Sequence, residues 1–92
     1  IVAGTIASSN IQNKPNPFAD MTTIEMVSNR AEPATLRIFD LSGTLVHTRN
    51  ITLVNGENEY VIRRSELKGS GMYMYEIESD FQYSTNRMII VD

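Results

Sequence analysis

Side chains that could perform catalysis or bind a metal ion are few in this sequence. It holds one histidine, His47, and no cysteine. A zinc site draws mainly on histidine and cysteine ligands, and a serine triad needs a histidine beside a nucleophile, often in a Gly-x-Ser-x-Gly turn that does not occur here. His47 lies inside a predicted strand, and we interpret it as a strand residue. The sequence therefore predicts no catalytic residue, no metal site and no cofactor, and the chain is not expected to be an enzyme.

Turn formation explains most of the other polar signals. Asp40 and Asp80 lie beside predicted turns and do not repeat at the spacing of a calcium loop. Gly69 and Gly71 lack the following lysine and helix of a phosphate loop, so we interpret them as turn glycines. Asn50 opens an Asn-Ile-Thr triplet, which matches a glycosylation acceptor and also arises often by chance.

Four tyrosines could either form an aromatic ligand platform or supply area to a core. They are Tyr60, Tyr73, Tyr75 and Tyr83. Because they stand at strand spacing, the core interpretation is favoured, with the hydroxyl groups reaching polar partners or water.

Length and charge limit the organisation and the partners. The 92 residues correspond to one small domain, and the formal net charge of −3 argues against a nucleic-acid surface. The adjacent pair Arg63-Arg64 is interpreted as a solvated strand end. No apolar run reaches the length of a membrane-spanning helix. The chain begins at Ile1 without methionine, and we expect it to be a piece of a longer protein.

Alternation of apolar and polar residues predicts an all-β fold. The expected strands cover residues 22–27, 34–40, 44–48, 51–54, 58–63, 72–79 and 81–91. About seven short strands with turn residues between them, and no long amphipathic helix, indicate an immunoglobulin-like antiparallel β-sandwich. In the sixth segment we expect Tyr73, Tyr75 and Ile77 to face the core.

The connections carry recognisable turn chemistry. Asp40 to Gly43 is expected to form a turn with glycine at positive φ. Asn55-Gly56 predicts a tight hairpin between the flanking segments. Residues 65–68 are expected to form one helical turn capped by Ser65.

The N-terminal part differs from the rest in composition. Residues 1–13 have no sustained period and are interpreted as a flexible linker, whereas residues 14–92 are expected to form the sandwich. Pro15 and Pro17 restrict the backbone at this boundary, and Phe18 is expected to cover the open end of the core.

Four segments occur in the order of a known family. They are Pro15-Asn16-Pro17-Phe18, the strand and turn that contain Gly43, the Leu67 to Tyr73 stretch with Gly71, and the ending Arg87-Met88-Ile89-Ile90-Val91. In these segments the chain resembles the C-terminal sorting domains of the type IX (Por) secretion system. The resemblance covers residues 14–92.

The resemblance implies a signal domain of Gram-negative bacteria, with an immunoglobulin-like fold. It implies that a type IX translocon reads the domain in the periplasm and exports an upstream passenger across the outer membrane. A sortase-like surface protease would then cut the linker, leaving the passenger at the cell surface or outside the cell. Exposed residues of the last strands would supply the binding surface, with backbone pairing at a sheet edge as one means.

Two further interpretations stay open at this point. The sandwich could instead be an accessory binding or spacer module of an extracellular enzyme, which would carry an exposed aromatic platform or a calcium site. Exposed edges of a small sandwich can also pair between copies, so a homodimer through sheet edges is compatible with this organisation.

Overall fold

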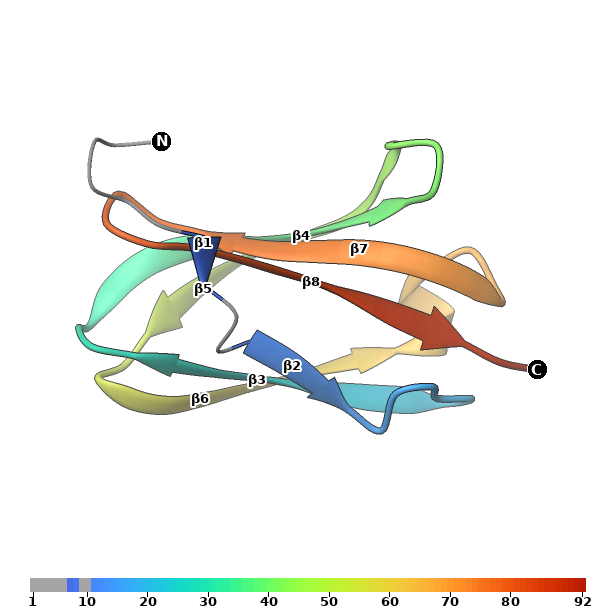
Figure 1. Ribbon diagram of the computed structural model, residues 1–92, viewed down its shortest axis with the longest axis horizontal. Helices are drawn as coiled ribbons and strands as arrows, with labels where there is room; N and C mark the ends of the chain where they lie inside the picture. The colour runs from blue at the N-terminus through green and yellow to red at the C-terminus, as the bar shows by residue number, and fades with distance from the viewer. Residues whose placement is uncertain (1–6, 9–10) are drawn as a thin grey trace.

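The computed structural model describes residues 7–8 and 11–92, and these form a two-layer β-sandwich. One sheet has five strands in the order β1-β8-β7-β4-β5, and the other has three in the order β2-β3-β6. Figure 1 shows the larger sheet above the smaller one, with the last strand, β8, beside the N-terminal strands. The all-β sandwich expected from the sequence is confirmed.

The strands follow one another with short connections. Their bounds are β1 Ala7–Ser8, β2 Ile11–Lys14, β3 Met21–Ser28, β4 Glu32–Asp40, β5 Leu45–Leu53, β6 Gly56–Arg63, β7 Gly71–Glu78 and β8 Tyr83–Ile90. A 3-10 turn, η1, covers Arg64–Glu66. Neighbouring strands pair antiparallel, except that β1 runs parallel to β8.

Side-chain alternation along the strands produces one core between the sheets. Tyr73, Tyr75 and Ile77 of β7 are buried as expected, and Phe18 is only 2% exposed. The buried apolar residues are Ile11, Phe18, Ile24, Met26, Ala34, Leu36, Ile38, Ile51, Leu53, Ile62, Tyr73, Tyr75, Ile77, Met88 and Ile90. The core therefore draws on every strand from β2 to β8.

The predicted hairpin at Asn55-Gly56 is wrong. β5 pairs with β4 and β6 pairs with β3, so this connection passes from one sheet to the other. A type I′ hairpin turn needs positive φ at both central residues. Gly56 has φ +108°, but Asn55 does not have positive φ, since no residue other than glycine has it in the described part of the chain. Asn58 fixes the crossing: its side chain accepts from the Val54 N–H at 2.8 Å and donates to the Val54 carbonyl at 3.0 Å.

The predicted break at Arg49-Asn50 is also wrong, because β5 runs through it. Arg49 projects from β5 toward the other sheet, where it donates to the Val61 carbonyl at 3.3 Å and to Glu66 at 3.1 Å. Arg49 thus binds residues beyond β5, across to the other sheet, without ending the strand. The two short segments predicted here are one strand.

The helical turn near Ser65 begins one residue earlier than expected, and Ser65 does not cap it. Arg63 precedes it, and the Arg63 N–H donates to the Glu66 carboxylate at 2.9 Å.

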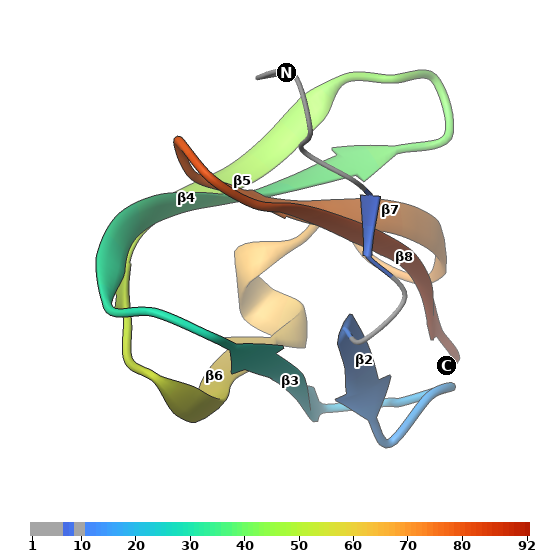
Figure 2. The same ribbon diagram turned by 60° about the vertical axis from the view of Figure 1, so that its left-hand side comes forward.

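The folded part starts earlier than the sequence suggested. β2 begins at Ile11, whose side chain is fully buried, and pairs with β3 along its length. The expected linker at residues 1–13 therefore overlaps the sandwich at its C-terminal end; residues 1–6 and 9–10 lie outside the described residues. Figure 2 shows β2 at the side of the sandwich below β8.

Candidate functional site

Residues 15–18, the first motif of the family resemblance, close the outer edge of β8. β7 pairs with one side of β8, so residues Arg87, Ile89 and Val91 direct their backbone groups to the other side. Asn16 donates its Nδ2 to the Arg87 carbonyl at 3.2 Å, and its Oδ1 accepts the Ile89 N–H at 3.0 Å. The Phe18 N–H then donates to the Ile89 carbonyl at 2.9 Å, and the Phe18 carbonyl accepts the Val91 N–H at 2.8 Å.

The side chain of Asn16 thus takes the place of a neighbouring strand. Its amide presents an N–H donor and a carbonyl acceptor to the β8 edge, as the backbone N–H and C=O of one residue in a neighbouring strand would. Pro15 and Pro17 on either side have no N–H, and both of their preceding peptide bonds are cis. At this point the pairing with β8 is made by the Asn16 side chain.

Arg64 completes the closure at the end of the strand. Its Nη1 donates to the Val91 carbonyl at 2.7 Å and to the Ala19 carbonyl at 3.3 Å. Its Nη2 lies 3.1 Å from the Asp92 carboxylate. We call Asn16, Phe18 and Arg64 together the β8 clasp.

The first half of the same edge is covered as well. β1 pairs with Tyr83 and Ser84. Asn86 donates its Nδ2 to the Ile11 carbonyl at 2.8 Å, and its Oδ1 accepts the Arg87 N–H at 2.8 Å. The last strand is consequently paired on both sides, and backbone pairing of a partner with β8, as considered from the sequence, meets an occupied edge in this conformation.

The residues of the last motif divide between two environments. Met88 and Ile90 are buried in the core, Ile89 is half-buried, and Arg87 and Val91 are exposed. Only the outward set can meet a partner while the sandwich is intact.

The third motif supports the same end of the molecule. Gly71, at φ +138°, pairs with Ile90, and Tyr73 pairs with Met88. The Tyr73 hydroxyl donates to the Gly69 carbonyl at 2.8 Å, and Leu67 packs against the core. These residues hold β7 against β8, so three of the four motifs meet in one place.

Gly43 lies apart from that cluster, in the turn between β4 and β5. Asp40 organises this turn: its Oδ1 accepts from the Ser42 hydroxyl at 2.6 Å and from the Thr44 N–H at 3.0 Å. The hydrogen bonds from Ser42 and Thr44 lower the pKa of Asp40 to about 2. Lys68 reaches Asp40 at 3.4 Å, which connects this turn to the third motif.

A buried polar network joins the two sheets beneath the clasp. The Tyr75 hydroxyl of β7 donates to Asn13 Oδ1 of β2 at 3.1 Å, and Asn13 Nδ2 donates to Thr22 Oγ1 at 3.1 Å. Thr22 in turn donates to the Pro15 carbonyl at 2.8 Å. Burial raises the pKa of Tyr75, so its hydroxyl remains a donor. Sequence reasoning missed Asn13; the alternation of Ile11 and Asn13 was the available signal.

The outer face of the five-stranded sheet has two halves. In one half Arg37 donates to Glu76 and Glu78, each at 2.9 Å. These hydrogen bonds raise the pKa of Arg37, and the bond to Glu78 contributes most. Tyr83 donates to Glu76 at 3.1 Å in the same network. The other half is apolar around Arg87, with Met74 directly beside it in the strand register.

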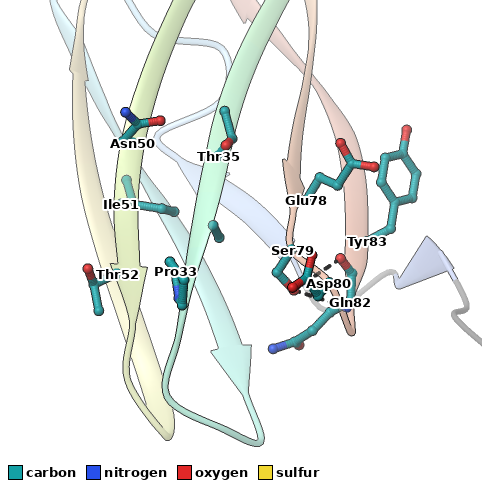
Figure 3. A pocket seen from close by; sticks show the side chains of 11 residues that line it. Pro33, Thr35, Asn50, Ile51, Thr52, Glu78, Ser79, Asp80, Gln82 and Tyr83 are labelled. Atoms are coloured by element: carbon teal, nitrogen blue, oxygen red, sulfur yellow. Dashed lines mark hydrogen bonds between the residues drawn. The ribbon is translucent and has the colours of Figure 1, made fainter. Parts of the chain in front are cut away.

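A shallow hollow lies at the far end of this face, between β4, β5 and the β7–β8 turn (Figure 3). Tyr83 is its one aromatic lining residue, and Ser79 and Gln82 hydrogen-bond to each other in its wall. Two of the other tyrosines, Tyr73 and Tyr75, belong to the core. Among the residues described, no group of three or more His, Cys, Asp or Glu side chains could hold a metal ion.

None of the described segments forms a helix that is long and apolar enough to cross a membrane.

Comparison with known proteins agrees with the family resemblance seen in the sequence. The model of the secretion system C-terminal sorting domain family matches residues 15–91. The match begins at Pro15, directly before Asn16 of the β8 clasp, and includes the whole of β8. No curated protein matches the chain. The chain therefore belongs to the family of C-terminal sorting domains of type IX secretion.

Proposed function

We propose that this domain is read by the type IX translocon in the periplasm and takes an upstream passenger across the outer membrane. A sortase-like surface protease then removes the domain, and the passenger is attached to the cell surface through lipopolysaccharide. The observation that carries the proposal is the family match over residues 15–91. A sorting signal of this system implies contact with its machinery, an upstream passenger, and export to the cell surface or the extracellular space.

The direct test is export of an inert reporter. Residues 1–92 are fused behind a periplasmic reporter in a host that has the system, with a known sorting domain as the positive control. We expect the reporter outside the outer membrane. A reporter that stays in the periplasm while the control is exported would contradict the proposal.

We place the cleavage position before Ile11. A protease binds its substrate as an extended, unpaired segment, whereas β2 is paired with β3 from Ile11 onward and the Ile11 side chain is buried. Mass spectrometry of the released domain should find a new N-terminus upstream of residue 11. A cut between residues 11 and 18 would contradict this placement.

Pairing of two copies through sheet edges is proposed only at an edge other than β8. The clasp and β1 occupy that edge, whereas β5 and β6 each end a sheet. Sedimentation velocity over a concentration series checks whether the domain self-associates.

A further inference from the structure

We propose that the sorting machinery recognises β8 through side chains on the outer face of the sheet, and that its receptor presents an apolar surface with a carboxylate for Arg87. This rests on the proposed sorting function. The surface in question consists of Phe39, Met72, Met74, Arg87 and Ile89, and we call it the Arg87 patch.

Occupation of the β8 edge favours this mode of recognition over strand addition. A peptide that adds to a sheet needs free N–H and C=O groups along the edge strand. From Arg87 to Val91 the outward groups are bonded to Asn86, Asn16, Phe18 and Arg64. A receptor would have to break these bonds before it could pair with the strand.

The strand register makes the Arg87 patch continuous. Phe39 of β4 lies opposite Met74 of β7, and Met74 lies opposite Arg87 of β8. One row further along, Met72 lies opposite Ile89. Directly opposed side chains on one face of a sheet are in contact distance, so three strands contribute to one surface.

Exposure shows that this surface faces away from the core. Met74 is 45% exposed and Arg87 is exposed, while the other three members of the patch are half-buried. Leu41 in the β4–β5 turn and Leu45 at the start of β5 are also exposed, at 72% and 47%. Clustered apolar side chains on an exposed face are typical of a protein interaction site.

Charge defines the chemistry of the partner. Among the described residues, no hydrogen bond or ion pair engages the guanidinium of Arg87, whereas Arg37 on the same face is held by Glu76 and Glu78. A guanidinium within an apolar interface requires an acceptor, and a carboxylate binds it best. The receptor should therefore place an acidic side chain against Arg87 and apolar side chains around it.

A matched pair of double variants tests the inference in the reporter fusion. Met74→Ser with Arg87→Glu changes the Arg87 patch. Met21→Ser with Arg63→Glu makes the same changes at another Met-Arg pair, which is opposed in register on the other sheet, and Met21 is 43% exposed. Circular dichroism melting of the isolated 92-residue chain confirms that both variants fold.

We expect the Arg87 variant to reduce the exported fraction by about tenfold or more, because arginines surrounded by apolar contacts contribute strongly to interfaces. The Met21/Arg63 variant should be exported like the unchanged domain. Equal export of both variants, or an equal loss in both, would overturn the inference while export of the unchanged domain still supports the sorting function. If the unchanged domain is not exported, the sorting function itself fails.

A third variant separates side-chain recognition from strand pairing. Asn16→Ala removes the side chain that occupies the edge at Arg87 and Ile89. Under the inference it does not increase export per folded molecule. A faster export of this variant would show that the strand edge is read, and would overturn the inference.

Discussion

At the scale of single residues, Asn16 has a role that backbone usually fills. It bonds one carbonyl and one N–H of β8 from a position between two prolines, which have no backbone N–H of their own. The Pro-Asn-Pro motif was visible in the sequence, but the strand with which Asn16 pairs was not. That partner lies more than 70 residues away, and nothing local to either segment indicates the pairing.

Replacement of Asn16 by alanine should lower the free energy of unfolding by about 1–2 kcal/mol, because it removes two hydrogen bonds of ordinary net strength. Asn16→Asp should lose less, since a carboxylate still accepts the Ile89 N–H. Urea denaturation measures both. The control is Asn29→Ala, an exposed position at the β3–β4 turn. A loss no larger than that of the control would contradict the role of Asn16.

Asp40 gives the turn at Gly43 a pH dependence. Its pKa is about 2 in the folded domain against an ordinary value of 3.8, because the bonds from Ser42 and Thr44 favour the carboxylate. The lowered pKa means that this stabilisation is complete above pH 3.8 and is lost as the pH falls toward 2.

Asp40→Asn should therefore flatten the fall of the melting temperature with pH between about 4 and 2. Asp80→Asn removes another turn carboxylate, one without a side-chain hydrogen bond in the described structure, and serves as the control. Melting curves over this range measure the effect. Parallel pH profiles for Asp40→Asn and the unchanged domain would contradict the assignment.

At the scale of elements, local patterns predicted strands well and their partners poorly. The segments at 22–27, 34–40 and 72–79 correspond to β3, β4 and β7, because their alternating side chains are buried on one face. The hairpin at Asn55-Gly56 failed because turn residues indicate a reversal without indicating the sheet to which the next strand belongs. β2 was missed because only two of its residues, Ile11 and Asn13, face inward.

The contact between Tyr75 and Asn13 should contribute measurably to the packing of β2 on β7. Tyr75→Phe keeps the ring and leaves the buried Asn13 oxygen without the hydroxyl donor, which should cost about 1–3 kcal/mol of unfolding free energy. Tyr60→Phe is the control, since its hydroxyl makes longer bonds of 3.3 Å. Equal stability of Tyr75→Phe and the unchanged domain in urea would contradict the role of this network.

At the scale of the whole molecule, two segments that lie far apart in the sequence depend on each other in the fold. Residues 16–18 pair with residues 87–91 along the β8 edge, and β8 also contributes Met88 and Ile90 to the core. The family resemblance gave the motifs in order but not this contact, which is a product of the sheet topology. The sequence was thus sufficient for the fold class and the family, and insufficient for which backbone groups a partner could reach.

Deletion of residues 87–92 should unfold the domain. It removes two core side chains, each worth about 1.5–3 kcal/mol when buried, together with the clasp bonds, from a domain whose total stability is on the order of 5–15 kcal/mol. Circular dichroism should show loss of the cooperative melt. A cooperative transition in the shortened chain would show that β8 is dispensable for folding.

The measurement that tests the central claim most directly is the exported fraction of a reporter fused to residues 1–92. It is compared between a host with an active type IX translocon and the same host with the translocon inactivated. We expect the reporter at the surface or in the medium only in the first host. Retention in the periplasm of both hosts, with the fused domain folded, would contradict the assignment as a sorting signal.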